Sequence, residues 1–297
     1  MRTLTMRWEG RRQSDNIEDR RGVPTRGLAI GGGLGSLVLI LVMLALGVDP
    51  QALLQDVPAG AGGVGPGAAR APDNPPENDP QAEFVSVVLA DTEDVWNELF
   101  PSSFGQRYEP PTLVLFQGAV QTDGCGFAGA AVGPFYCPLD EKAYLDLGFF
   151  DELSNRFGAQ GDFARAYVIA HEIGHHVQNL LGISDEVRRL QESARTEEEA
   201  NSLSVRLELQ ADFLAGVWAH HADRMNQILE PGDLEEALRA ANAIGDDTLQ
   251  RRGQGQVVPD SFTHGTSAQR VRWFRQGFQT GDVDQLDEFF STAYDRL

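Results

Sequence analysis

The feature that most constrains this chain's fold is a largely apolar segment from Asp162 to Gly182 whose middle carries two histidines four residues apart and a glutamate. Asp and Gly are typical of a helix start and a helix end, and the apolar residues between them lie on most faces, so we predict a buried helix. His171 and His175 are four residues apart, which places both imidazoles on one face, with Glu172 beside them. The fold must provide partners for these groups, because unpaired buried polar groups are costly.

The pattern His171-Glu-x-x-His175 is typical of zinc hydrolases. The two imidazoles would bind Zn²⁺, and Glu172 would take a proton from an attacking water and pass it to the departing amine of a peptide. The competing interpretation is a pair of core histidines with ordinary hydrogen bonds. The apolar surroundings favour metal binding, so we predict one Zn²⁺ per chain as the cofactor.

A catalytic zinc site keeps three protein ligands and one open position, so a third ligand is needed. One known pattern places a His six residues after His175, and no His stands there. The other option is a Glu on a later helix, which the sequence predicts from Thr196 to about Met225. We predict that Glu208 of this helix is the third ligand. Asp212, one turn further on, would accept a hydrogen bond from the far nitrogen of His171 or His175. The alternative is a solvated acidic helix face.

The remaining catalytic candidate lies near the C-terminus. His264 stands in a loop just before a helix predicted to begin at Thr266 or Ser267. A peptidase needs a donor for the oxyanion that develops on the substrate carbonyl, and loops on a scaffold often carry such groups. We therefore consider His264 a catalytic candidate. The alternative left open is that Thr266 or Ser267 caps the helix and His264 is incidental.

The first 80 residues differ in composition from the rest. Residues 27–47 contain no charged side chain, and a helix of that length spans the roughly 30 Å hydrocarbon layer of a membrane. Arginines before it and acids after it predict a single-pass cell-membrane protein, with residues 1–26 in the cytoplasm and the remainder outside. A cleaved signal peptide is the alternative, which the length of the apolar run disfavours. Residues 48–80, rich in Pro, Gly and Ala, predict a flexible linker, and residues 81–297 the folded domain.

The cysteine pair and the charge bear on partners. Cys125 and Cys137 are the two cysteines of the chain, and outside a membrane such a pair usually forms a disulfide, which we predict; metal binding without a nearby His is the weaker alternative. The net charge is -20 although residues 1–26 carry seven Arg and four acids, so the body of the protein is strongly acidic. Such a surface repels nucleic acid, which we exclude as a partner. The predicted partners are a peptide or protein substrate and the membrane.

Helical patterns dominate the chain, so the predicted fold class is α+β and mainly helical. The other predicted elements are helices beginning at Gln81 and Asp233, a last helix over 283–290, and strands over Thr112–Phe116 and Ala143–Leu147 that pair in a small sheet.

Over residues 81–297 the chain resembles the neutral zinc metallopeptidase family of bacterial membrane-anchored proteins. The motifs that carry the likeness are Cys125-Gly, Gly133-Pro-Phe-Tyr-Cys-Pro138, Tyr144-Leu-Asp146, His171-Glu-Ile-Gly-His-His176, Glu208-Leu-Gln-Ala-Asp212 and Thr263-His-Gly-Thr-Ser-Ala-Gln-Arg270. Their order also looks like that of integral-membrane gluzincin peptidases. The resemblance implies a zincin-like fold with His171, His175 and Glu208 as ligands. We expect a membrane-anchored zinc metallopeptidase; the alternative is a zinc-stabilised envelope module that binds a protein partner without catalysis.

Overall fold

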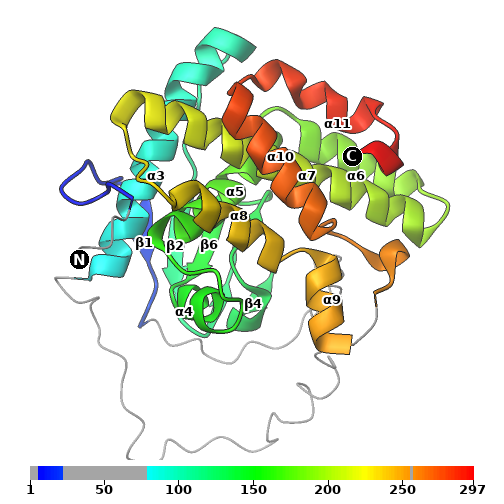
Figure 1. Ribbon diagram of the computed structural model, residues 1–297, viewed down its shortest axis with the longest axis horizontal. Coiled ribbons are helices and arrows are strands. Elements are labelled where there is room, and N and C mark those ends of the chain that lie inside the picture. Colours follow the sequence, from blue (N-terminus) through cyan, green and yellow to red (C-terminus); the bar gives the residue numbers. More distant parts are fainter. Residues whose placement is uncertain (1–5, 23–78, 255–256) are drawn as a thin grey trace, which may run out of the picture.

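The computed structural model describes residues 6–22, 79–254 and 257–297, which are mainly helical, with a four-stranded mixed sheet and a two-stranded hairpin (Figure 1). This confirms the α+β class. The strands are β1 (Ile17–Asp19), β2 (Thr112–Phe116), β3 (Ala119–Gln121), β4 (Phe127–Gly129), β5 (Phe135–Cys137) and β6 (Lys142–Asp146). The α-helices are α3 (Pro80–Leu99), α4 (Gly148–Asn155), α5 (Asp162–Leu180), α6 (Ile183–Ser193), α7 (Glu197–Asn226), α8 (Asp233–Ala243), α9 (Asp246–Gln254), α10 (Ser267–Thr280) and α11 (Glu288–Ser291).

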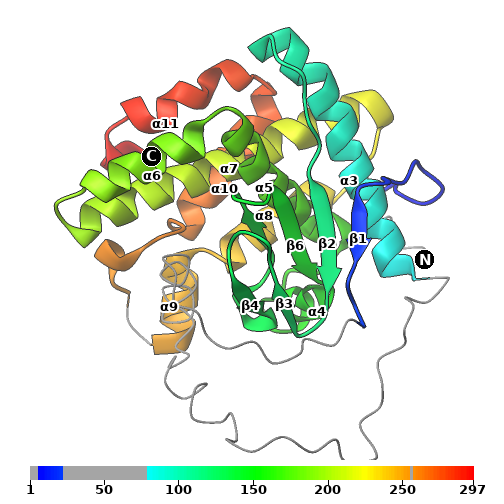
Figure 2. The same cartoon turned by 180° about the vertical axis from the view of Figure 1, so that it is seen from behind.

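The four-stranded sheet has the strand order β1-β2-β6-β5. The first three strands run parallel, with Ile17 opposite Leu113 and Leu113 opposite Ala143, whereas the edge strand β5 is antiparallel to β6. Figure 2 shows β1, β2 and β6 side by side. β2 and β6 are buried along nearly their whole length, as expected for parallel strands that are covered on both faces. The predicted pairing of these two strands is thus confirmed.

A disulfide joins Cys125, in the loop of the β3–β4 hairpin, to Cys137 at the end of β5. The predicted bond is therefore confirmed, and the pair does not bind metal. Cys137 is fully buried, so the bond fastens the hairpin to the edge strand of the sheet.

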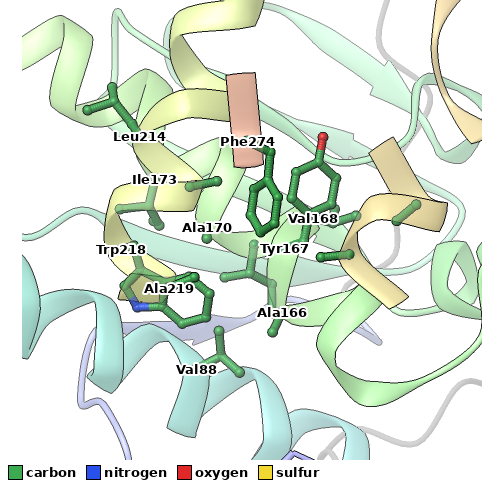
Figure 3. Packing of buried hydrophobic residues seen from close by; sticks show 14 of the residues in the cluster. Val88, Ala166, Tyr167, Val168, Ala170, Ile173, Leu214, Trp218, Ala219 and Phe274 are labelled. Carbon is green, nitrogen blue, oxygen red and sulfur yellow. The ribbon is translucent and has the colours of Figure 1, made fainter. Parts of the chain in front are cut away.

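Helix α5, which carries the two histidines of the zinc motif, lies in the middle of the core. Its Ala166, Ala170 and Ile173 are buried among side chains of α3, α7 and α10, such as Val88 and Trp218 (Figure 3). The helix begins at the predicted Asp162, although Gly161 occupies the capping position, and Gly182 follows its end in a left-handed conformation. The predicted buried helix is thus present, and the neighbouring helices that bury it include α3, α7 and α8.

Two glycines allow α7 and α10 to approach each other closely. A methyl group added to Gly216 would lie 2.1 Å from the carbonyl oxygen of Phe274, and one added to Gly277 would lie 2.0 Å from that of Phe213. Both distances are far shorter than any real contact, so the backbones touch at these points. Helix α10 begins after Thr266, whose side chain caps it in a capping box with Gln269.

The N-terminal segment packs against this domain. β1 pairs with β2, and Met6 is buried in the main hydrophobic core. Arg11 binds Asp91 of α3 through both terminal nitrogens, at 2.6 Å each, and Arg12 binds Glu93 of the same helix. The acids of α3 thus neutralise arginines that the sequence pattern placed in the cytoplasm.

The predicted localisation, with residues 1–26 in the cytoplasm and the domain outside the membrane, is therefore wrong. Ile17–Asp19 are hydrogen-bonded to Leu113–Leu115, and segments joined in one sheet cannot lie on opposite sides of a membrane. None of the helices within 6–22, 79–254 and 257–297 is long and apolar enough to cross a bilayer. The predicted membrane helix over 27–47 lies outside the described residues, as does the predicted linker up to residue 78.

Candidate metal centre

Three of the predicted site residues meet where α5 packs against α7. Nε2 of His171 lies 3.2 Å from Oε2 of Glu208, and Nε2 of His175 lies 3.4 Å from Oε1 of the same carboxylate. One nitrogen or oxygen atom of each side chain lies within 4.8 Å of the others, and no other such group of His, Cys, Asp or Glu occurs in the described part of the chain. The spacing of four residues along α5 explains why the two imidazoles lie on one face of the helix, and the packing of α7 against α5 brings the carboxylate of Glu208 to them.

The donor set and its spacing fit zinc. In a tetrahedral zinc site with bonds of about 2.0–2.1 Å, ligand atoms are about 3.3–3.4 Å apart, close to the two imidazole–carboxylate separations seen here. Two imidazoles and one carboxylate are also a ligand set that zinc hydrolases use, with the fourth position left for water or substrate. His171 is buried, and the side chains of His175 and Glu208 are less than a fifth exposed. Three such groups facing one point suit a divalent cation.

Each imidazole is held by a hydrogen bond from its far nitrogen. Nδ1 of His171 donates to Oδ1 of Asp212 at 2.9 Å, and Nδ1 of His175 donates to Oε1 of Gln178 at 2.8 Å. Both bonds hold Nε2 on the side that faces Glu208, where it can bind a metal once the metal has displaced its proton. Asp212 thus lies where the sequence predicted, and its partner is His171.

Asp212 is the centre of a buried polar cluster. Its carboxylate is fully buried and also accepts hydrogen bonds from the hydroxyl of Tyr167, at 2.5 Å, and from the guanidinium of Arg270. Gln178, the partner of His175, is fully buried as well and donates through Nε2 to the carbonyl of Leu207 at 2.7 Å. These contacts connect α5, α7 and α10 behind the imidazoles.

Carboxylates that face imidazoles set the electrostatics of the site. Burial lowers the pKa of His171, but the charge of Asp212 and the hydrogen bonds to Asp212 and Glu208 outweigh it and raise this pKa to about 10. Burial raises the pKa of Glu208, yet the neighbouring imidazoles hold it well below its usual range. A metal that binds here therefore replaces a proton on His171, and it meets a carboxylate that is already ionised.

Glu172 differs from Glu208 in electrostatics, although both side chains are partly exposed. Glu172 follows His171 in α5. Burial raises its pKa, and the nearby charge of Glu208 adds to this effect, although His171 and His175 oppose it. A carboxylate with a raised pKa is suited to accept a proton and to return it.

His264 lies near the same carboxylate, in a loop organised by an acid that the sequence did not indicate. Oδ2 of Asp246 accepts hydrogen bonds from the backbone nitrogens of Thr263, His264 and Gly265, and Oδ1 lies 3.2 Å from Nδ1 of His264. Burial lowers the pKa of His264, but the charges of Asp246 and Glu208 outweigh it and raise this pKa. Thr266 caps α10, as one interpretation of the loop expected, and Asp246 holds the imidazole of His264, whose catalytic role stays a prediction.

The other histidines are bound elsewhere. Nε2 of His176 donates to the carbonyl of Glu109 at 2.7 Å, and its Nδ1 accepts from the hydroxyl of Tyr136 at 2.9 Å. His220 and His221 donate to backbone carbonyls of the α10 C-terminal region. None of the three lies in the group of donor atoms described above.

Sequence reasoning missed four residues that support the site: Tyr167, Gln178, Asp246 and Arg270. For Tyr167 a signal existed, since it precedes His171 by one helical turn and lies on the same face. Gln178 follows His175 by three residues, which is also a same-face spacing. Arg270 ends one of the motifs that carry the family resemblance, but its partner lies on another element, so the sequence did not indicate its role. The partners of Asp246 lie in the later His264 loop, and no local pattern indicated this acid.

Comparison with known proteins places the whole arrangement in a family. A family model described as "Putative neutral zinc metallopeptidase" matches residues 6–289. "Uncharacterized protein YpfJ" of Escherichia coli (strain K12) is 50% identical over 293 residues, which cover 96% of this chain and 99% of that protein. "Uncharacterized protein Rv2575" of Mycobacterium tuberculosis (strain H37Rv) is 47% identical over 205 residues, 66% of each chain. No solved structure matches the chain. The chain belongs to the family described as "Putative neutral zinc metallopeptidase".

Proposed function

We propose that this protein is a zinc-dependent peptidase that hydrolyses peptide bonds in peptides or proteins. The observation that carries the proposal is the meeting of His171, His175 and Glu208, in which both imidazoles lie at zinc-ligand spacing from the carboxylate. The three side chains hold one zinc ion. When bound, zinc lowers the pKa of a water molecule and polarises the carbonyl of the substrate. The family membership supports the same metal and the same class of substrate.

Glu172 is the general base and then the general acid of the proposed reaction. It takes a proton from the water that attacks the carbonyl carbon, and it gives this proton to the nitrogen of the departing amine. Its raised pKa and its partial exposure beside His171 support both steps. A purely structural zinc site has no use for an acid in this position, and structural sites usually have four protein ligands.

His264 is the proposed donor to the oxyanion that forms on the carbonyl oxygen. The Asp246 carboxylate fixes the loop and raises the pKa of the imidazole, so that a proton is available for donation. A charged donor is worth more than a neutral one where negative charge develops. The side chain is also partly exposed, 28%, which leaves it open to a substrate.

The arrangement of elements supports a zincin-like organisation of the domain. α5 carries the two imidazoles and packs against α7, which carries the carboxylate, and α5 also contacts strands β5 and β6 of the mixed sheet. The antiparallel strand β5 forms the edge of this sheet and contacts α5.

The proposal is tested on the full chain by measuring zinc per molecule and the cleavage of a diverse peptide mixture by mass spectrometry. The wild-type protein should hold one zinc and cleave peptides, and the Glu172→Gln variant should keep zinc but lose about 100-fold or more of the rate. Glu186→Gln, on the exposed surface of α6, is the matched control and should keep both.

Two outcomes separate the proposal from its rival. A wild-type protein without zinc would contradict any zinc function. A zinc-loaded protein that cleaves peptides equally well with Glu172→Gln would contradict the role of Glu172. Zinc binding without cleavage of any peptide would instead favour a non-catalytic module that binds a protein partner.

A further inference from the structure

Arg270 is a buried cation that binds Asp212, the hydrogen-bond partner of His171 in the candidate metal centre. Its side chain is 3% exposed and that of its partner Asp212 is fully buried. Nε of Arg270 donates to Oδ2 of Asp212 at 2.8 Å and Nη2 donates to Oδ1 at 3.0 Å, so the guanidinium binds both oxygens of this carboxylate. This two-pronged contact fixes the plane of the carboxylate, which a single donor would leave free to turn.

The oxygen that faces the metal ligand is shared. Oδ1 of Asp212 accepts from Nη2 of Arg270, from Nδ1 of His171 at 2.9 Å and from the hydroxyl of Tyr167. The position of this oxygen therefore determines the direction in which the imidazole of His171 points. Because Arg270 belongs to α10 and His171 to α5, a third helix orients a side chain of the first.

Packing alone does not require a charge at this position. The contact between α7 and α10 is already provided by the two glycines, and burying an ion pair brings a desolvation cost that well-packed apolar residues avoid. Because this ion pair is costly to bury, its presence points to a role that needs the planar guanidinium, which can donate two parallel hydrogen bonds. Nη1 of Arg270 also donates to the carbonyl of Ile244. Ile244 lies two residues before Asp246, so the guanidinium contacts the segment whose Asp246 holds the His264 loop.

We propose that Arg270 is a positioning residue of the metal centre: it holds Asp212 so that His171 presents Nε2 to the zinc ion. This inference rests on the proposed function, because it assumes that the site binds zinc. It extends that function by a residue that contacts neither the metal nor the substrate. Loss of Arg270 should therefore weaken zinc binding although His171, His175 and Glu208 remain in place, as is typical when a group that holds a metal-binding histidine is removed.

The test uses the full chain and compares zinc dissociation constants, measured at one pH by competition with a chromogenic chelator. Arg270→Met removes the fork and should weaken zinc binding about 10- to 100-fold. Arg275→Met, on the exposed side of the same helix, is the matched control and should bind zinc like the wild type. The visible spectrum of the cobalt-substituted protein should also change with Arg270→Met, because the orientation of an imidazole ligand changes, and stay constant with Arg275→Met.

Arg270→Lys provides a second variant if Arg270→Met fails to fold. It keeps the charge but offers one point donor, so its zinc affinity should lie between those of the wild type and Arg270→Met. Combining Arg270→Met with Asp212→Asn should weaken binding no more than Asp212→Asn alone, since both act through one carboxylate.

The outcomes are distinct. A folded Arg270→Met or Arg270→Lys protein with the wild-type affinity and cobalt spectrum overturns the positioning role and leaves the proposed peptidase intact. A wild-type protein that binds no zinc overturns both.

Discussion

The indole nitrogen of Trp8 donates a hydrogen bond of 3.0 Å to the carboxylate of Asp162, the first residue of α5. The N-terminal segment thus contacts the helix that carries His171 and His175, although more than 150 residues separate them. Trp8 also packs edge-to-face on Phe84 of α3. Residues 6–22 are therefore a structural part of the domain, and their removal should affect more than the strand β1.

The ion pair between Arg11 and Asp91 offers the most direct test of this contribution. Asp91 is 3% exposed in its side chain, so loss of Arg11 leaves a buried carboxylate without its cation. We expect Arg11→Ala to lower the free energy of unfolding by about 3 kcal/mol. Burial raises the pKa of Asp91 to about 6 although Arg11 lowers it, so the loss should be full near pH 8 and shrink as the pH falls and the carboxyl protonates.

Urea unfolding of the full chain at several pH values measures this loss. Arg7→Ala is the control, because Arg7 is 54% exposed and its pair with Glu230 should contribute no more than about 1 kcal/mol. Equal effects of the two variants would contradict the structural role given to Arg11.

Local patterns predicted the long helices and missed the N-terminal strand for a physical reason. α5 and α7 have caps and apolar periodicity that are visible within a window of residues. β1 is three residues long, Ile-Glu-Asp, and its partner β2 begins more than 90 residues later. Its pairing depends on long-range contacts that no short window contains, and the surrounding arginines fitted a membrane flank equally well.

The same distinction applies to the metal centre. The His171 and His175 pair follows from helix geometry, and Glu208 was a candidate because a third ligand is needed. Arg270 could not be found in this way, since its contact with Asp212 depends on how closely α7 and α10 approach. That distance is set by two glycines whose role appears only when the helices are packed.

Replacing Gly277 with Ala tests this close approach. Ala is the better helix former, by about 1 kcal/mol, so an isolated helix would gain stability. In the folded protein the added methyl group would lie 2.0 Å from the carbonyl oxygen of Phe213, which forces the two backbones apart. We expect a net loss of about 3 kcal/mol or more in the free energy of unfolding.

Thermal and urea unfolding of Gly277→Ala and of a control variant measure this loss of stability. Gly129→Ala is the control, because the nearest atom to its added methyl group lies 3.9 Å away, and its stability should change by less than about 1 kcal/mol. A Gly277→Ala protein as stable as the wild type would show that the helices can separate without cost.

His176 should make the folded protein sensitive to mild acid. The imidazole is 1% exposed, and its two nitrogens are engaged by Glu109 and Tyr136 in a way that needs the neutral form. Burial lowers its pKa from 6.5 to about 4. Between these values His176 binds a proton in the unfolded chain but not in the folded one. Its contribution to the free energy of unfolding is therefore complete above about pH 6.5 and is lost as the pH falls toward 4. The pKa difference corresponds to about 3 kcal/mol.

The measurement compares the wild type with His176→Gln by urea unfolding between pH 7 and pH 4, with metal removed from both so that zinc release does not contribute. Gln has a donor and an acceptor but does not titrate, so the stability of the variant should fall less over this range, by about 3 kcal/mol. Carboxylates elsewhere titrate in both proteins and cancel in the difference. Parallel pH profiles for the two proteins would mean that His176 accepts a proton in the folded state as readily as in the unfolded chain, and the buried neutral imidazole would then be the wrong description.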